Sequence, residues 1–344
     1  MRCSDKHSEG REYIAKARTG LLVHHPRKHA SRVATVTAHF IIAPVRLRRG
    51  ILSGMMHFDD NETLEQALAR NVRDALMEDI GRGDWTAQLV PAGRRVQAQV
   101  LAKEAAVICG RPWFDACVQA LDAAANVEWL VAEGEAIAAG TLVCRIASDA
   151  RALLSAERPA LNFLQTLSAV AGTTRRYVDA IAGVSPNPRG CAVLDTRKTL
   201  PGLRQAQKYA VRIGGGRNHR MALWDGILIK ENHIAAAGGI TAVLRNAQAL
   251  NAGVAIQIEV ESLAQLAEAL AAGAASVLLD NFDVAGMREA VALNGGRALL
   301  EVSGGVQFDQ VREIAATGVD RISIGRLTKD VRATDYSMRV LGAL

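Results

Sequence analysis

Six short apolar runs, each followed by a segment of helical composition, constrain the fold of this 344-residue chain more than any other feature. The runs are CAVLD, GILIK, AIQIEVE, SVLLD, ALLEVSGG and DRISIG, and they lie near residues 193, 228, 257, 278, 300 and 322. Their spacing of 21 to 35 residues is typical of successive strand and helix units. Because strands this apolar are buried on both faces, the pattern predicts a parallel sheet covered by helices.

The polar residues of this repeat lie at the carboxyl ends of the predicted strands. They are Asp195, Lys230, Glu259, Asp280, Ser303 and Gly325. In a (β/α) barrel this rim carries the active site. An open doubly wound sheet also binds its ligand at strand ends, so the pattern favours a barrel without excluding the open sheet. Six units are fewer than eight, and we therefore expect an incomplete (β/α) barrel of six to seven strands.

The segment before the repeat has a different pattern. A helical stretch from Asn61 is followed by short alternating runs separated by turn residues. These predict a smaller N-terminal α/β domain, sandwich-like in the α+β sense, over residues 56–170, and place the barrel in residues 171–326. Pro159 lies early in a helical stretch that joins the two, where its ring would open a new helix or introduce a kink.

The net charge of +6 is concentrated at the N-terminus. Residues 1–54 hold eleven Lys and Arg against three Asp and Glu, a local charge of +8, and the remainder of the chain carries −2. The charge therefore does not indicate a nucleic-acid-binding body. With 49% hydrophobic residues and no apolar run of eighteen residues, the sequence is typical of a soluble globular protein without a membrane-spanning helix.

Three interpretations compete for the basic segment. We favour an upstream start codon, with the natural protein beginning at Met55 or Met56 and residues 1–55 forming a disordered or non-native extension. An Arg-rich targeting peptide and a basic arm for nucleic acid are the alternatives. The arm is weakened by the lack of aromatic residues among its cations, which single-strand binders use for stacking.

The five cysteines, Cys3, Cys109, Cys117, Cys144 and Cys191, contain no C-x-x-C pair and no metal-ligand spacing. This set predicts buried free thiols in a reducing cytoplasm, with neither a zinc site nor a disulfide framework.

Residues 195–233 contain eight Lys or Arg, two His and a GGG triplet. The cations lie next to chain-reversing glycines and at the ends of apolar runs, which indicates a pocket for an anionic small molecule. Arginine grips a carboxylate with two parallel hydrogen bonds, and a dianion needs cations at both ends. The candidates are Arg197, Lys198, Arg204, His219, Arg220 and Lys230. Arg204 could equally cap its helix or pair with another residue of it and not bind a ligand. His233 could equally have a purely structural role.

Glu259 and Asp280 end neighbouring predicted strands. Carboxylates at these positions could bind sugar hydroxyls or hold Mg²⁺ through water, since Mg²⁺ prefers oxygen ligands shared with substrate phosphates. Glu261 would point the same way as Glu259 if its strand continued, so the pattern does not choose between them.

Ser303, Gly304 and Gly305, together with Gly325, resemble the phosphate grip that closes many barrels, in which backbone amides hold the phosphate. The glycines at 214–216 predict a flexible loop that admits close backbone approach. The sequence contains no G-x-G-x-x-G fingerprint, Walker A motif or G-x-S-x-G elbow, and dinucleotide, ATP and serine-hydrolase functions are not indicated.

Taken together, the motifs resemble the quinolinate phosphoribosyltransferase family, also called nicotinate-nucleotide pyrophosphorylase (carboxylating). They are EDIGRGDWTAQLVP, ERPALNFLQTLSAVAGTT, DTRKTLPGLR, GGGRNHR, DGILIKENH, IEVES, LLDNF, EVSGG and ISIGRLTKDV. The resemblance runs from about residue 57 to the C-terminus, and DTRKT with NHR and IKENH is its most specific part. Residues 1–54 have no counterpart.

The resemblance implies a homodimer whose subunits have an N-terminal α/β domain, an incomplete α/β barrel and a C-terminal tail, residues 327–344, packing back on the first domain. It implies that quinolinate and 5-phosphoribosyl 1-pyrophosphate, with Mg²⁺, give nicotinate mononucleotide, pyrophosphate and CO₂ in de novo NAD synthesis. Such a reaction needs no covalent nucleophile and depends on positioning and electrostatics.

The resemblance also implies roles for individual residues. Arg197, Lys198, His219 and Arg220 would hold the quinolinate carboxylates, and Arg158 of ERPALNF would reach the same pocket from the neighbouring subunit. Lys230 would lie between quinolinate and the sugar phosphate, Glu259 and Asp280 would face the ribose and metal, and Ser303, Gly304, Gly305 and Gly325 would take the 5-phosphate. Arg326 stands where the family usually has a small residue.

The sequence leaves two alternatives to quinolinate phosphoribosyltransferase activity open. A related phosphoribosyltransferase could act on nicotinate or on the ligand of molybdenum-transport-associated proteins, but a monocarboxylate would leave part of the cation cluster unpaired. A non-catalytic protein with a nucleic-acid-binding basic arm is the other. We expect small-molecule substrates, a dimer or higher oligomer in the cytoplasm, and neither nucleic acid nor membrane as a partner.

Overall fold

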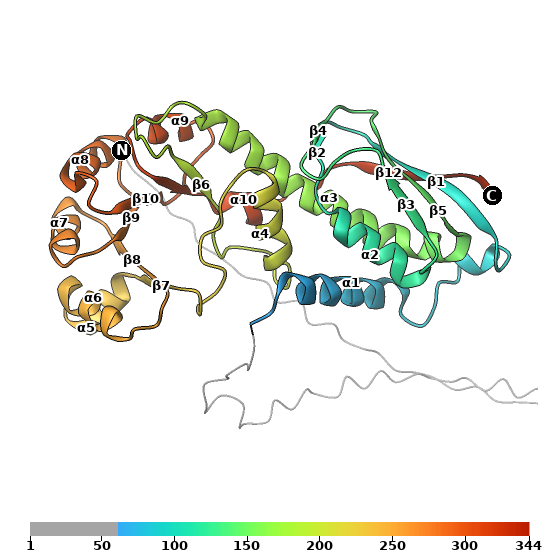
Figure 1. The fold of residues 1–344 in the computed structure, drawn as a ribbon, viewed down its shortest axis with the longest axis horizontal. Coiled ribbons are helices and arrows are strands. Elements are labelled where there is room, and N and C mark those ends of the chain that lie inside the picture. The colour runs from blue at the N-terminus through green and yellow to red at the C-terminus, as the bar shows by residue number, and fades with distance from the viewer. Residues whose placement is uncertain (1–60, 344) are drawn as a thin grey trace, which may run out of the picture. The chain divides into compact units, whose positions relative to one another are not determined.

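The computed structural model describes residues 61–343, and the expectations for residues 1–55 lie outside this range. The described residues form an antiparallel sheet with helices and a parallel sheet with helices, the latter reached through the long helix α3 (Figure 1). The elements up to this helix are α1 (Leu64–Ile80), a short 3-10 helix (Ala87–Leu89), β1 (Arg95–Ala102), β2 (Ala106–Val107), α2 (Arg111–Leu121), β3 (Asn126–Trp129), β4 (Ala136–Ile137), β5 (Leu142–Asp149) and α3 (Ala150–Ile181).

The elements after α3 alternate between strand and helix, except where two helices follow β7. They are β6 (Ala192–Leu194), α4 (Arg204–Ile213), β7 (Gly226–Ile229), α5 (Glu231–Ala237), α6 (Ile240–Ala249), β8 (Ala255–Val260), α7 (Leu263–Ala271), β9 (Ser276–Asp280), α8 (Val284–Asn294), β10 (Leu299–Ser303), α9 (Val311–Ala315), β11 (Arg321–Ser323), α10 (Arg326–Lys329) and β12 (Tyr336–Ala343).

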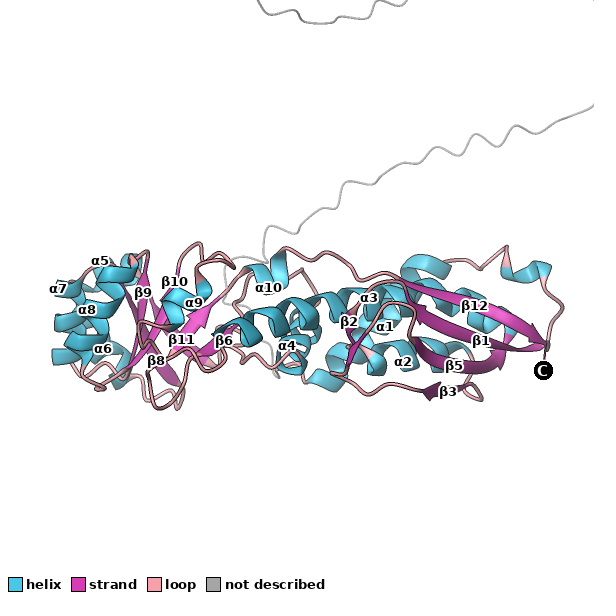
Figure 2. Cartoon of the chain, turned by 90° about the horizontal axis from the view of Figure 1, so that it is seen from above, coloured by secondary structure: helices cyan, strands magenta, loops and turns pink. Residues whose placement is uncertain are grey.

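The antiparallel sheet has the strand order β12-β1-β5-β3 (Figure 2). Strand β1 alternates between buried and more exposed residues, as expected of a sheet with one face covered. Helices α2 and α3 supply large buried side chains, among them Trp113, Phe114 and Leu161. Strand β12, close to the C-terminus, pairs with β1, with Met338 opposite Val100. This smaller α/β domain confirms the predicted fold class.

Local signals explain where the two longest helices begin. Thr63 and Gln66 form a reciprocal capping box at the start of α1, with hydrogen bonds of 3.2 and 2.8 Å. The Asp149 side chain accepts hydrogen bonds from the amides of Arg151 and Ala152 at the start of α3. Helix α3 then runs for 32 residues through Pro159, so no new helix begins at the proline.

The parallel sheet has the order β6-β11-β10-β9-β8-β7. Strands β7 to β11 lie side by side in chain order. The last of them, β11, also pairs with β6, which comes first in the chain. A doubly wound sheet would instead reverse its order halfway across. The prediction of an incomplete barrel is therefore confirmed and the open-sheet alternative is wrong. A parallel bridge between Arg217 and Leu194 adds a strand-like seventh segment at the open edge beside β6.

The described cysteines are free thiols. Burial raises the pKa of Cys117, Cys144 and Cys191 to about 12, which makes them poor nucleophiles. Within residues 61–343, no helix combines the length and apolar character that crossing a membrane requires.

Candidate active site

The carboxyl ends of the parallel strands surround a cavity of about 260 Å³. Most of the residues that the strand-end and cation patterns singled out contribute to its wall. The lining residues are Thr196, Arg197, Lys198, His219, Arg220, Leu228, Lys230, Glu259, Leu278, Glu301, Ser303 and Ser323. The tertiary structure thus brings together residues of five strands, β7 to β11, and of the segments 196–198 and 219–220, which are separated by more than a hundred positions in the chain.

Three cations of this cavity have no ion-pair partner among the described residues. These are Arg197, Lys198 and Arg220, whereas Lys230 is paired. Burial, and then the neighbouring Arg197, lower the pKa of Arg220, and its Nη1 donates to the carbonyl of Gly226 at 3.0 Å. A bound anion would offset this repulsion, because it would place opposite charge between the two guanidinium groups. The cavity is therefore prepared for a ligand with more than one negative charge.

Lys230 and Glu259 form the ion pair of the rim. The Lys230 Nζ lies 2.8 Å from Glu259 Oε2. Glu261 follows the end of β8, is exposed and does not line the cavity, so the choice between the two glutamates falls on Glu259. Burial, followed by the nearby Glu259, raises the pKa of Asp280, which lies at the end of β9 outside the cavity lining.

The glycine-containing turns after β10 and β11 need small residues for steric reasons. Gly304 has φ +101°, and a Cβ at this position would lie 2.5 Å from Asn281 Oδ1. A Cβ on Gly325 would lie 3.2 Å from Cδ of Lys198. Gly305 also has a positive φ, +60°. The turn at Gly325 lies next to Lys198, and Ser303 of the other turn lines the same cavity as this lysine, an arrangement that suits a phosphate.

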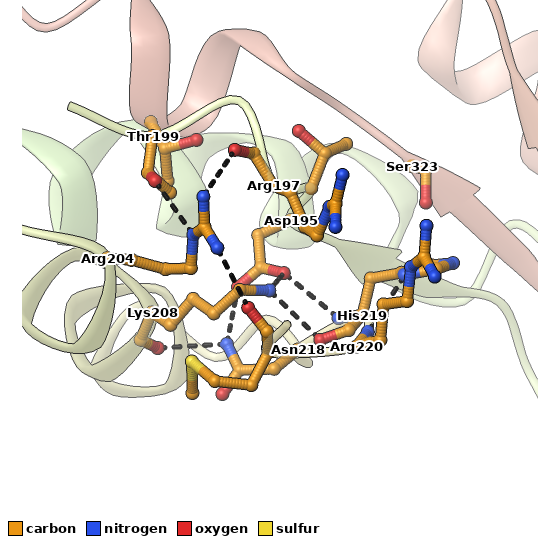
Figure 3. A network of polar contacts seen from close by, with 12 residues as sticks. Asp195, Arg197, Thr199, Arg204, Lys208, Asn218, His219, Arg220 and Ser323 are labelled. Atoms are coloured by element: carbon orange, nitrogen blue, oxygen red, sulfur yellow. Dashed lines mark hydrogen bonds and ion pairs between the residues drawn. The ribbon is translucent and has the colours of Figure 1, made fainter. Parts of the chain in front are cut away.

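A buried polar cluster lies behind the cationic wall, between β6 and α4. Figure 3 shows Lys208, Asn218 and the backbone of His219 converging on Asp195. Lys208 and Asp195 are ion-paired with fully buried side chains. Lys208 Nζ also donates to the carbonyl of His219 at 2.9 Å, and the His219 amide donates to Asp195 Oδ1 at 2.9 Å. The cluster fixes the segment that carries His219 and Arg220 to the end of β6.

Several sequence alternatives are resolved by contacts. Arg204 donates to Thr199 Oγ1 and to the carbonyls of Arg197 and Met221, and does not line the cavity. It therefore links two loops. His233 Nδ1 accepts from the amide of Lys230 at 3.0 Å, a helix-capping contact.

Other predicted residues lie away from the cavity. Arg158 is an exposed residue of α3 and does not line it. The close backbone approach predicted for the glycines at 214–216 occurs against α3, because a Cβ on Gly214 would lie 2.5 Å from the carbonyl oxygen of Ala171. Arg326 begins α10, and its Nε lies 3.7 Å from Asp330 Oδ2.

Four residues of the site were not predicted from the sequence: Lys208, Asn218, Gln257 and Glu301. Signals for some of them existed. Lys208 falls between buried apolar positions of α4, where a lysine needs a partner. Gln257 and Glu301 lie two residues before Glu259 and Ser303, and therefore point to the same side of their strands as these rim residues.

Comparison with known proteins agrees with this geometry. Residues 84–168 match the N-terminal domain and residues 170–339 the C-terminal domain of quinolinate phosphoribosyl transferase. A probable nicotinate-nucleotide pyrophosphorylase [carboxylating] of Synechocystis is 41% identical over 270 residues, covering 77% of this chain and 90% of its own length. The nicotinate-nucleotide pyrophosphorylase [carboxylating] of Mycobacterium leprae is 40% identical over 277 residues, with 78% and 95% covered.

A solved structure supports the same relationship. The nicotinate-nucleotide pyrophosphorylase of Francisella tularensis aligns with a TM-score of 0.77 at 38% identity, covering 82% of this chain and all of that one. The resemblance inferred from the motifs is thereby confirmed. This chain belongs to the quinolinate phosphoribosyltransferase family.

Proposed function

We infer that this protein catalyses the carboxylating synthesis of nicotinate mononucleotide in de novo NAD biosynthesis. Quinolinate and 5-phosphoribosyl 1-pyrophosphate are the substrates, and pyrophosphate and CO₂ are the other products. The observation that carries the inference is a group of three cations at one cavity, Arg197, Lys198 and Arg220, that have no ion-pair partner within residues 61–343. Together with the names of its relatives, this charge supports a dicarboxylate ligand.

The chemistry depends on positioning. Arg197, Lys198 and Arg220 hold the two carboxylates of quinolinate so that the pyridine nitrogen faces the anomeric carbon of the ribose. Lys230 and Glu259 lie on the sugar side, and the turns at Ser303 to Gly305 and at Gly325 hold the 5-phosphate. As pyrophosphate leaves, the nitrogen attacks the cation-like anomeric carbon. The positively charged ring nitrogen then stabilises the electron pair that the adjacent ring carbon keeps as CO₂ leaves, and a proton from solvent adds to this carbon to give nicotinate mononucleotide.

The donor set suits Mg²⁺ shared with the substrate. Glu259 and Asp280 end adjacent strands, and two carboxylates with substrate phosphates are a common magnesium arrangement. Among residues 61–343, no cluster of three or more His, Cys, Asp or Glu could hold a metal by itself. When bound, Mg²⁺ would neutralise charge on the departing pyrophosphate. Loss of activity with a chelator, restored by added Mg²⁺, is the expected result.

A shared active site in a homodimer accounts for Arg158. This arginine is exposed on α3 and away from the cavity of its own chain, so a partner subunit would have to bring it to the substrate. Arg158→Ala and Lys198→Ala subunits, each inactive, should recover about a quarter of wild-type activity when mixed and exchanged, since half the dimers then contain one intact site. If the exchanged dimers do not recover activity, the shared active site is contradicted.

We also assign the protein to the cytoplasm, because its described cysteines are free thiols, as in a reducing compartment. Fractionation of cells producing the full chain tests this, and recovery in a membrane or organelle fraction would contradict it.

The reaction itself is tested with purified protein, phosphoribosyl pyrophosphate and Mg²⁺, with quinolinate in one sample and nicotinate in another. Nicotinate mononucleotide and CO₂ formed only from quinolinate is the expected result. Activity only with nicotinate would keep the fold and overturn the substrate assignment. Absence of product in both samples would overturn the proposed enzymatic function.

A further inference from the structure

The interior of the barrel directly below the rim is polar. In (β/α) barrels this space is usually filled by branched aliphatic side chains. Here Gln257, Glu301 and Ser323 occupy it, with 7%, 0% and 5% exposure. A buried carboxylate is costly unless its oxygens are satisfied, so a charged residue at this depth calls for a function beyond packing.

These side chains form a hydrogen-bonded chain that ends at the active-site cavity. Gln257 Nε2 donates to Glu301 Oε2 at 3.0 Å, and the hydroxyl of Ser323 donates to the other carboxylate oxygen. Gln257 Oε1 lies 2.9 Å from His219 Nε2. The same His219 nitrogen lies 3.5 Å from Glu301 Oε1, so the carboxylate lies directly behind the imidazole.

The direction of these bonds determines the tautomer of His219. A carboxylate only accepts hydrogen bonds, so the amide nitrogen of Gln257 must face Glu301 and its carbonyl must face His219. The imidazole therefore carries its proton on Nε2. Its Nδ1 is left as an acceptor and receives the amide of Arg220 at 2.8 Å. The ring orientation is thus tied to the backbone turn that leads into Arg220.

We propose that Glu301 is a positioning residue that acts through Gln257 to fix the tautomer and orientation of His219, and thereby the placement of Arg220 in the quinolinate half of the cavity. This proposal rests on the proposed function for its kinetic part, but not for its structural part. Glu301 is part of the cavity wall, but it is fully buried, and its negative charge would repel the carboxylates of quinolinate rather than bind them. Its influence should therefore be confined to the side of the site that binds the carboxylates.

The first test is the tautomer. Histidine labelled with ¹⁵N, with the His219 signals assigned by their loss in His219→Asn, should show Nε2 protonated and Nδ1 unprotonated in the full-length protein. In Glu301→Gln the new amide can donate to Gln257, whose own amide can then turn towards His219. The Nδ1-protonated form should then appear, with loss of the hydrogen bond from the Arg220 amide. Ser323→Ala is the matched control, because it removes a donor to Glu301 without affecting Gln257. It should keep the original tautomer.

The second test is kinetic. Glu301→Gln and Gln257→Leu should raise the KM for quinolinate about tenfold and leave that for phosphoribosyl pyrophosphate within about twofold, since one polar partner of the binding wall is lost. An unchanged tautomer and quinolinate KM in both variants would overturn the proposal, as would equal increases in both KM values. If Glu301→Gln does not fold, the quinolinate KM of Gln257→Leu tests the proposal. A wild-type protein inactive with quinolinate would overturn the proposed function, while the NMR measurement would still test the positioning of His219 by Glu301 and Gln257.

Discussion

Two lysine–carboxylate pairs lie within the same barrel, and they differ in almost everything except their chemistry. Lys208 and Asp195 are both fully buried behind the cavity, whereas Lys230 is 45% exposed and its partner Glu259 10% exposed at the rim. The difference shows that solvent access, and not the pairing of charges, separates a structural ion pair from one that can exchange partners with a substrate.

The buried pair is held by further hydrogen bonds. Asn218 and the amide of His219 also donate to Asp195, and Lys208 also donates to the carbonyl of His219. Burial raises the pKa of Asp195 and lowers that of Lys208, and their mutual attraction opposes both shifts. Neither partner can be removed alone without leaving an uncompensated group inside the protein.

The rim pair has a different constraint. Water reaches Lys230, so its attraction to Glu259 is screened and contributes little to folding. The same access allows a substrate phosphate to compete for the lysine. The pair therefore holds two groups in place until ligands arrive.

The largest effect is expected from Lys208→Met. The substitution leaves Asp195 buried without its cation and should lower the free energy of unfolding by about 3–5 kcal/mol, measured by urea denaturation. The double variant Lys208→Met, Asp195→Asn removes both charges, keeps an acceptor for the His219 amide and should recover much of the loss. If Lys208→Met alone lowers the free energy of unfolding by less than about 1 kcal/mol, the buried pair stabilises the protein no more than the rim pair does.

Lys198→Ala tests the unpaired cations of the rim. The expected result is a fall of at least about a hundredfold in kcat/KM for quinolinate with an unchanged urea midpoint, because a preorganised charge at the reacting ligand is lost. Lys329→Ala, a half-exposed lysine of α10, is the control and should stay near wild type. Near-normal activity of Lys198→Ala would contradict the site assignment.

Lys230→Met should separate stability from activity. We expect the free energy of unfolding to change by less than about 1 kcal/mol, since the pair is partly solvated. The KM for phosphoribosyl pyrophosphate should rise about tenfold, since the cation on the sugar side is gone. Destabilisation as large as that of Lys208→Met would show that the rim pair is structural as well.

The smallest effect concerns pH. Burial and Glu259 raise the pKa of Asp280, so the folded protein binds this proton more tightly than the unfolded chain. The resulting stabilisation is present below the ordinary value of 3.8 and is lost as pH rises through the higher folded pKa. The stability of wild type relative to Asp280→Asn should therefore fall as the pH rises from about 3 to neutrality, by less than about 1 kcal/mol. Urea unfolding across this range measures it, with Asp309→Asn as an exposed control. A relative stability that rises with pH would reverse the assigned direction.

Much of the fold followed from local patterns. Apolar runs at regular spacing predicted the parallel strands, and their polar ends identified Lys230, Glu259 and Ser303 as cavity residues. Strand identity depends on periodicity over a few residues, which the sequence displays directly. The apolar pattern did not distinguish Glu259 from Glu261, because the difference between them depends on where β8 ends.

The sequence by itself determined the order of strands and helices, the excess of cations near the barrel rim and the family resemblance, because each is written in neighbouring residues. The tertiary structure alone decided which charges are satisfied. Lys208 pairs with Asp195 across 13 positions and Gln257 bonds Glu301 across 44, while Lys198 meets no carboxylate in the described chain. Such partnerships depend on distance and on exclusion of water, and both arise only when the strands close around a common interior.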